Sequence, residues 1–96
     1  MDYRIYLINL YDFYGDLLTE KQKKYFEYYY FDNLSLAEIS ENNNISRNAV
    51  HKQIKEVETK LEMYEQKLNL YEKSKKIKFL IKDLDNNLKN KIEELL

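Results

Sequence analysis

The 96-residue sequence has no cysteine, no proline, one glycine and one histidine. Without cysteine there can be no disulfide, no thiolate nucleophile and no Cys-ligated metal site. The single His51 has no second histidine at a metal-binding spacing, and one glycine cannot build a phosphate-binding loop. An enzyme is therefore the weakest interpretation, and no metal or cofactor is expected.

Long apolar runs are also missing. The longest is far short of the roughly 20 residues that a membrane span needs. The first fifteen residues lack the pattern of a signal peptide, so a cytoplasmic protein is expected. The length predicts a single domain, residues 1–96. The net charge of −1 argues against strong, non-specific binding of nucleic acid, which depends on accumulated Lys and Arg.

The scarcity of Gly and Pro, with abundant Lys, Glu, Leu, Asn and Ile, predicts an all-α fold of about five helices. Asp2 can cap a first helix that runs to about Tyr14, where Gly15 is expected to end it in the left-handed conformation. A second helix is predicted to begin at Thr19, with Gln22 completing a capping box. Its aromatic run, residues 25–31, is expected to fill the core and not to form a base-stacking platform.

The segment LSLAEISENNNISRNAVHKQI, residues 34–54, predicts two short helices joined by a tight turn. Ser35 and Glu38 can form a capping box, Ser46 can cap the second helix, and residues 42–44 fill the gap. Two apolar pairs can act as hydrophobic staples: Leu34 with Ile39, and Ile45 with Val50. This pattern is typical of a helix-turn-helix, placed at about residues 35–60, whose second helix enters a DNA groove.

The outer face of that second helix is the candidate nucleic-acid-binding site. It comprises Ser46, Arg47, Asn48, His51, Lys52 and Lys55. Arg47 is suited to guanine and Asn48 to adenine, while the lysines suit phosphates. Lys21, Lys23 and Lys24 are possible additional phosphate contacts. The alternative is a purely structural helical corner, since four acidic residues accompany the four basic ones in residues 34–60.

The second half of the chain, a C-terminal extension at about residues 61–96, carries two apolar stripes. The first is an a/d seam for self-association: Ile54, Val57, Leu61, Tyr64, Leu68 and Tyr71. The glutamates between these positions are expected on a solvated face. A bend is expected near Ser74, followed by a last amphipathic helix with apolar positions from Ile77 to Leu95.

Neither stripe can be buried by its own helix. The stripes should therefore cover one another, pack on the first helix, or pair with a second chain, and a homodimer is favoured. Residues 73–82, KSKKIKFLIK, hold five lysines and no acid. They are expected to be a solvated helix end, with phosphate contact as the minor alternative.

Residues 18–68, LTEKQKKYFEYYYFDNLSLAEISENNNISRNAVHKQIKEVETKLEMYEQKL, resemble the YlxM family of small bacterial proteins. That family is expected to bind DNA, and its genes neighbour those of the signal recognition particle. Its middle is similar to the fourth region of sigma factors, a pattern matched here by Thr19-Glu20, residues 34–40, and Ile45-Ser46 to Val50. Ser40 stands where Ala is usual.

The resemblance implies an all-helical protein with a sigma-like helix-turn-helix and a regulatory role in the signal recognition particle pathway. The implied partner is DNA. The alternative is a protein-interaction module that contacts the particle's GTPase or its RNA without binding DNA. No other sigma region is present, so promoter recognition as a sigma factor is not implied.

Overall fold

A computed structural model describes residues 2–96, and this part of the chain is helical with no strand. Its elements are α1 (Tyr3–Tyr14), the 3-10 helix η1 (Gly15–Leu17), α2 (Glu20–Tyr30), α3 (Leu36–Asn43), α4 (Arg47–Leu68), α5 (Leu70–Ile81) and α6 (Asn86–Glu93). The predicted all-α class is confirmed, with six α-helices in the described residues where about five were expected.

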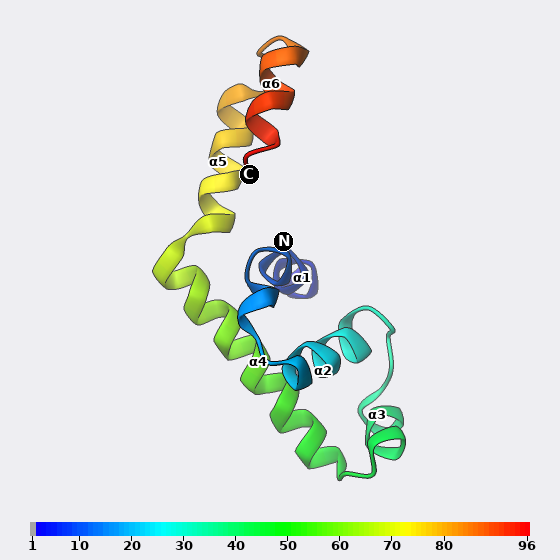
Figure 1. Cartoon of the computed structure of the whole chain (residues 1–96). Coiled ribbons are helices and arrows are strands. Elements are labelled where there is room, and N and C mark those ends of the chain that lie inside the picture. Colours follow the sequence, from blue (N-terminus) through cyan, green and yellow to red (C-terminus); the bar gives the residue numbers. More distant parts are fainter. Residues whose placement is uncertain (1) are drawn as a thin grey trace.

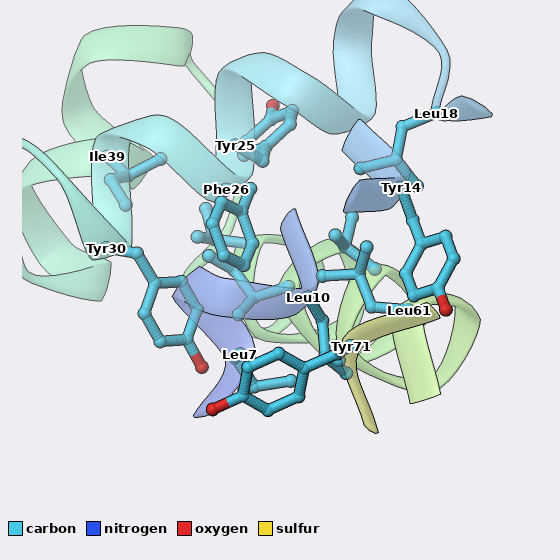
Figure 2. Packing of buried hydrophobic residues seen from close by; sticks show 13 residues of the cluster. Leu7, Leu10, Tyr14, Leu18, Tyr25, Phe26, Tyr30, Ile39, Leu61 and Tyr71 are labelled. Atoms are coloured by element: carbon cyan, nitrogen blue, oxygen red, sulfur yellow. The ribbon is translucent and has the colours of Figure 1, made fainter. Parts of the chain in front are cut away.

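The long helix α4 is the central element of the fold, because α1, α2 and α3 all pack against it (Figure 1). The fully buried side chains come from every one of these helices, among them Leu7, Phe26, Ile39, Val50 and Leu61. Figure 2 shows how side chains of α1, α2 and α4 meet in this core. The core therefore fixes the inward side of the helix-turn-helix.

Aromatic rings fill the space between α1 and α2. The ring of Phe26 stacks on Tyr11 and on Tyr30, each with centroids 4.4 Å apart. Tyr25, Phe26 and Tyr30 are buried, and the prediction that the aromatic run builds the core is confirmed for these residues. Tyr28 and Tyr29 are half-buried against the core, and Phe31 is 45% exposed.

The prediction for Gly15 was wrong. Gly15 has an ordinary right-handed conformation, φ −54°, and begins η1 instead of ending α1 in the left-handed region. A residue without a side chain is needed here for another reason, because a Cβ at this position would lie 3.2 Å from the ring of Tyr11. Close packing, and not backbone freedom, makes glycine suitable at this position.

The expected solvated glutamate face of α4 is partly buried. Glu58 and Glu65 are each only 7% exposed. The hydroxyl of Tyr30 donates to Glu58, and that of Tyr14 donates to Glu65 Oε1 at 2.5 Å. Both carboxylates are thereby satisfied inside the protein, as buried charges must be. Burial and the bond to Glu65 raise the pKa of Tyr14 to about 12.

The bend after α4 lies at Asn69, and not near Ser74 as predicted. Asn69 takes the left-handed conformation, φ 54°, whereas Ser74 is buried within α5. Glu65 stabilises this junction by accepting the backbone N–H groups of Tyr71, at 3.1 Å, and Glu72, at 3.0 Å. A carboxylate from α4 thus satisfies N–H groups that the start of α5 leaves without a helical partner.

The C-terminal segment is a hairpin of α5 and α6, and not one continuous helix. Residues 82–85 form the turn, and the Asp85 carboxylate accepts the Leu88 N–H at 3.1 Å to cap α6. The molecule is elongated, with extents of 53 × 25 × 24 Å. The hairpin lies at one end and α3 at the other (Figure 1).

The predicted seam is divided between core and surface. Ile54, Val57 and Leu61 are buried within the chain, where α1 and α2 cover α4. Tyr71 is also buried and Tyr64 is half-buried, whereas Leu68 remains 45% exposed. Five further apolar side chains of the α5–α6 hairpin are exposed: Leu70, Phe79, Leu80, Leu84 and Leu88.

Candidate nucleic-acid interface

Both helices of the helix-turn-helix have the predicted caps. In α3, the Ser35 hydroxyl accepts the Glu38 N–H at 3.1 Å, and the Glu38 carboxylate accepts the Ser35 N–H at 3.0 Å. The bond from the Ser35 N–H stabilises the carboxylate and lowers the pKa of Glu38. In α4, the Ser46 hydroxyl accepts the Ala49 N–H at 3.1 Å. The two caps fix where each helix begins.

The turn between α3 and α4 is closed by asparagine and serine. Asn44 adopts the left-handed conformation, φ 53° and ψ 43°, which asparagine tolerates better than most side chains. The amide of Asn43 donates to the Ile39 carbonyl at 2.8 Å, and the hydroxyl of Ser40 donates to the Ile45 carbonyl. Ser40 thus has a role that alanine could not fill, because its hydroxyl links α3 by a hydrogen bond to the segment that precedes α4.

Arg4, at the start of α1, positions the segment that leads into the helix-turn-helix. Its guanidinium donates to the carbonyls of Tyr29 and Tyr30, each at 2.9 Å, and to Asn33 Oδ1 at 2.7 Å. These carbonyls lie at the C-terminus of α2, where a cation is favourable. The loop that leads into α3 is thus anchored to α1.

The structure places all six predicted site residues on the exposed side of the first turns of α4. They are Ser46, Arg47, Asn48, His51, Lys52 and Lys55. On the opposite side of the same turns, Val50 and Ile54 are buried in the core. The helix is therefore held with a polar, solvent-facing surface outward, as groove entry requires.

The charge on this face is uneven. Lys55 Nζ lies 3.4 Å from Glu58, so part of its charge is already compensated. Arg47 and Lys52 form no ion pair within residues 2–96. A hollow beside His51 and Lys55 is lined by these two residues with Tyr29, Leu36, Ile54 and Glu58. Arg47 and Lys52 are consequently the strongest cationic positions of the face.

The three lysines of α2 are not equivalent. Lys23 Nζ lies 3.4 Å from Asp16 and 3.6 Å from Glu20, which directs it toward acids of the protein. Lys21 and Lys24 instead line a hollow together with Tyr25, Tyr28 and Asn43. Asn43 is distant from these lysines in the sequence, and only the packing of α2 on α3 brings them together.

The outward surface of α4 extends further than predicted. Another hollow is lined by Lys52, Lys55, Glu56, Thr59, Lys60 and Met63. The helical repeat of 3.6 residues, followed beyond Lys55, was the signal that could have found Thr59 and Met63. The mixed charge of this extension leaves the main cationic surface at the N-terminal end of α4.

Two further findings concern the described residues as a whole. No cluster of three or more His, Asp or Glu side chains in residues 2–96 is arranged to hold a metal ion. None of the helices described is at once long enough and apolar enough to cross a membrane.

The capped helix pair, its tight asparagine turn and the exposed polar face of α4 define a helix-turn-helix protein of the all-α class. The chain belongs to the family described as "Putative helix-turn-helix protein, YlxM / p13 like", which it matches over residues 1–96. The resemblance noted from the sequence is therefore confirmed.

Relatives in several bacteria support this assignment. The chain is 51% identical to a UPF0122 protein of Shouchella clausii, across 78% of this chain and 69% of the relative. It is 46% identical to one of Malacoplasma penetrans, across 90% and 86% of the two chains. With one of Clostridium acetobutylicum the identity is 45%, across 98% and 84%.

Proposed function

We propose that this protein is a non-enzymatic, cytoplasmic regulator that binds DNA through the N-terminal turns of α4. The observation that carries the proposal is the exposed face of Arg47, Asn48, His51 and Lys52 on a helix whose opposite side is fixed in the core. Arg47 and Asn48 would read base edges, and Lys52 would hold a phosphate. Lys21 and Lys24 would extend the phosphate contacts along α2.

The test is an Arg47→Ala/Lys52→Ala/Lys55→Ala variant in a DNA-binding titration at several salt concentrations. Each lost phosphate contact should flatten the dependence of log K on log salt by about one unit, and affinity should fall at least tenfold. A matched control, Lys67→Ala/Lys73→Ala/Lys91→Ala, removes the same charge from exposed positions elsewhere. Equal affinity of the two variants and the parent would show that α4 is not the binding element.

A second candidate is a module that contacts the signal recognition particle, through its GTPase or its RNA. The near-neutral charge of the chain and the compensated Lys55 favour it, because both weaken attraction to duplex DNA. Capture of partners from lysate with and without nuclease separates the candidates. A partner protein that stays bound after nuclease treatment supports protein contact. If no partner is captured under either condition, this second candidate is eliminated.

A symmetric dimer is the third part of the proposal. It would place two α4 N-termini for recognition of two half-sites. Ile54, Val57 and Leu61 already pack inside the chain, so the dimer contact would use exposed leucines in and just after α6, chiefly Leu88 and Leu95.

A further inference from the structure

The outward face of α5 combines exposed apolar side chains with lysines. Phe79 is 66% exposed and Leu80 is 77% exposed, and both lie in the last turn of α5. They line a shallow hollow with Glu72, Lys75 and Lys76. We call the surface formed by Lys73, Lys75, Lys76, Phe79 and Leu80 the basic–apolar face. The inward side of α5 is different, since Tyr71, Ser74 and Ile81 are buried there.

We propose that the basic–apolar face docks on an anionic lipid surface. A helix that lies in the membrane interface inserts Phe and Leu side chains at the boundary of the headgroups and keeps Lys on its flanks. The long lysine stems let the ammonium groups reach lipid phosphates while the apolar rings and methyl groups enter. Residues 73–82 contain five lysines, and the acid that lines the same hollow, Glu72, is paired with Lys75, so the net charge of the face suits a negative surface.

The lysines differ in their internal contacts. Lys75 Nζ lies 3.3 Å from Glu72 and 4.8 Å from the centroid of the Tyr71 ring. Lys73 and Lys76 take part in no ion pair within residues 2–96. These two cations can therefore meet lipid phosphates without breaking a contact of the folded chain.

The chemistry of the face disfavours other occupants. A second copy pairing through the same face would bring like-charged lysines together, which is unfavourable in a symmetric contact. A protein groove that receives a helix needs apolar anchors at spacings of three, four and seven, whereas only the adjacent Phe79 and Leu80 are exposed here. A nucleic acid would be bound by the lysines alone and would leave the exposed Leu80 without an apolar partner.

The position of the face in the molecule makes docking feasible. The α5–α6 hairpin stands at the end of the molecule opposite α3 (Figure 1). A lipid surface that contacts α5 would leave the N-terminal turns of α4 accessible. The inference is thus independent of whether α4 binds DNA.

The test is co-sedimentation of the full chain with vesicles of phosphatidylcholine alone or with about 30% phosphatidylglycerol. We expect sedimentation with the anionic vesicles only, and release in about 0.5 M NaCl. The Phe79→Ser/Leu80→Ser variant should lower the partition coefficient about tenfold or more. The Lys73→Gln/Lys76→Gln variant should also bind more weakly. No sedimentation of the parent chain at low salt would overturn the proposal.

Matched controls assign the binding to this face. Ile5→Ser/Leu17→Ser removes two other apolar residues, each 53% exposed, and Lys89→Gln/Lys91→Gln removes charge from α6. Both should bind vesicles as the parent does, and circular dichroism should show all variants folded. Binding that Phe79→Ser/Leu80→Ser leaves unchanged would mean mere charge attraction and refute the docking. A change of molecular mass in that variant would instead identify the face as a contact between copies and refute it too.

Discussion

Glu65 links three parts of the molecule through one buried carboxylate. It accepts the Tyr14 hydroxyl from the end of α1 and the N–H groups of Tyr71 and Glu72 from the start of α5. The Tyr14 oxygen in turn accepts the Leu70 N–H at 3.0 Å. The junction of α4 with α5 is therefore held by side chains, in addition to the backbone bend at Asn69.

Loss of this carboxylate should destabilise the protein strongly. The Glu65→Ala variant leaves two backbone N–H groups and one hydroxyl with no acceptor, so we expect the free energy of unfolding to fall by about 3 kcal/mol or more. Urea denaturation measures the change. The Glu65→Gln variant keeps an accepting oxygen and should lose less. The Glu56→Ala variant, at an exposed position of the same helix, should differ from the parent by less than about 0.5 kcal/mol, and an equal loss there would contradict this assignment.

Alkaline pH should weaken the same contact. The Tyr14 pKa of about 12 in the folded chain exceeds its ordinary value near 10, so the folded state holds this proton more tightly than the unfolded state. Its contribution to stability is complete below pH 10 and is lost as the pH rises toward 12. Urea midpoints measured across this range should fall less steeply in Tyr14→Phe than in the parent. Identical slopes would show that Tyr14 does not contribute.

At the scale of the element, the turn between α3 and α4 sets how the two helices of the helix-turn-helix meet. The turn depends on the left-handed Asn44 and on bonds from the neighbouring Ser40 and Asn43. A change here can alter binding without touching the exposed face itself.

We therefore expect Asn44→Val to weaken both stability and DNA binding. A β-branched residue in the left-handed region costs about 1–2 kcal/mol, whereas Asn44→Gly should be nearly neutral. Thermal unfolding and a DNA titration measure the two effects. The control is Asn42→Val, an exposed helical position where the backbone is not left-handed. If Asn44→Val were no worse than Asn42→Val, the turn would not set the geometry of α4.

At the scale of the whole molecule, the proposed dimer would use apolar side chains in and just after the α5–α6 hairpin. Leu88, in α6, is 45% exposed, and Leu95, just after that helix, is 86% exposed. Light scattering at high micromolar concentration should give twice the 11.8 kDa mass of one chain. The Leu88→Ser/Leu95→Ser variant should have a mass closer to that of one chain, and the Leu17→Ser variant should keep the mass of the parent. A parent that measures 11.8 kDa at that concentration would refute the dimer.

Much of the fold was predictable because its signals are local. The caps at Thr19, Ser35 and Ser46, and the left-handed tolerance of asparagine in the turn, depend on residues within four positions of one another. The exposed face of α4 was also predictable, since a helix places residues by periodicity alone. What such signals cannot reveal is which partner covers a given side chain.

The acidic residues of α4 illustrate this difference. In the sequence, Glu58 and Glu65 belong to an ordinary alternation of charges. Their burial depends on hydrogen bonds from two distant tyrosines: Tyr30 lies 28 residues before Glu58, and Tyr14 lies 51 residues before Glu65. The bend was likewise placed near Ser74 because the apolar register is lost there, but Glu65 and Tyr14 favour a break at Asn69. Long-range contacts outweigh local periodicity where a buried charge must be satisfied.

The sequence by itself determined the helical class, the capped helix-turn-helix and the polar residues that α4 exposes, because caps and periodicity act over one or two turns. Only the tertiary structure decided that α1 and α2 cover the seam at Ile54, Val57 and Leu61, and that Phe79 and Leu80 stay in solvent. An apolar stripe shows that burial is favourable but does not specify its partner, and the partner depends on how distant helices pack.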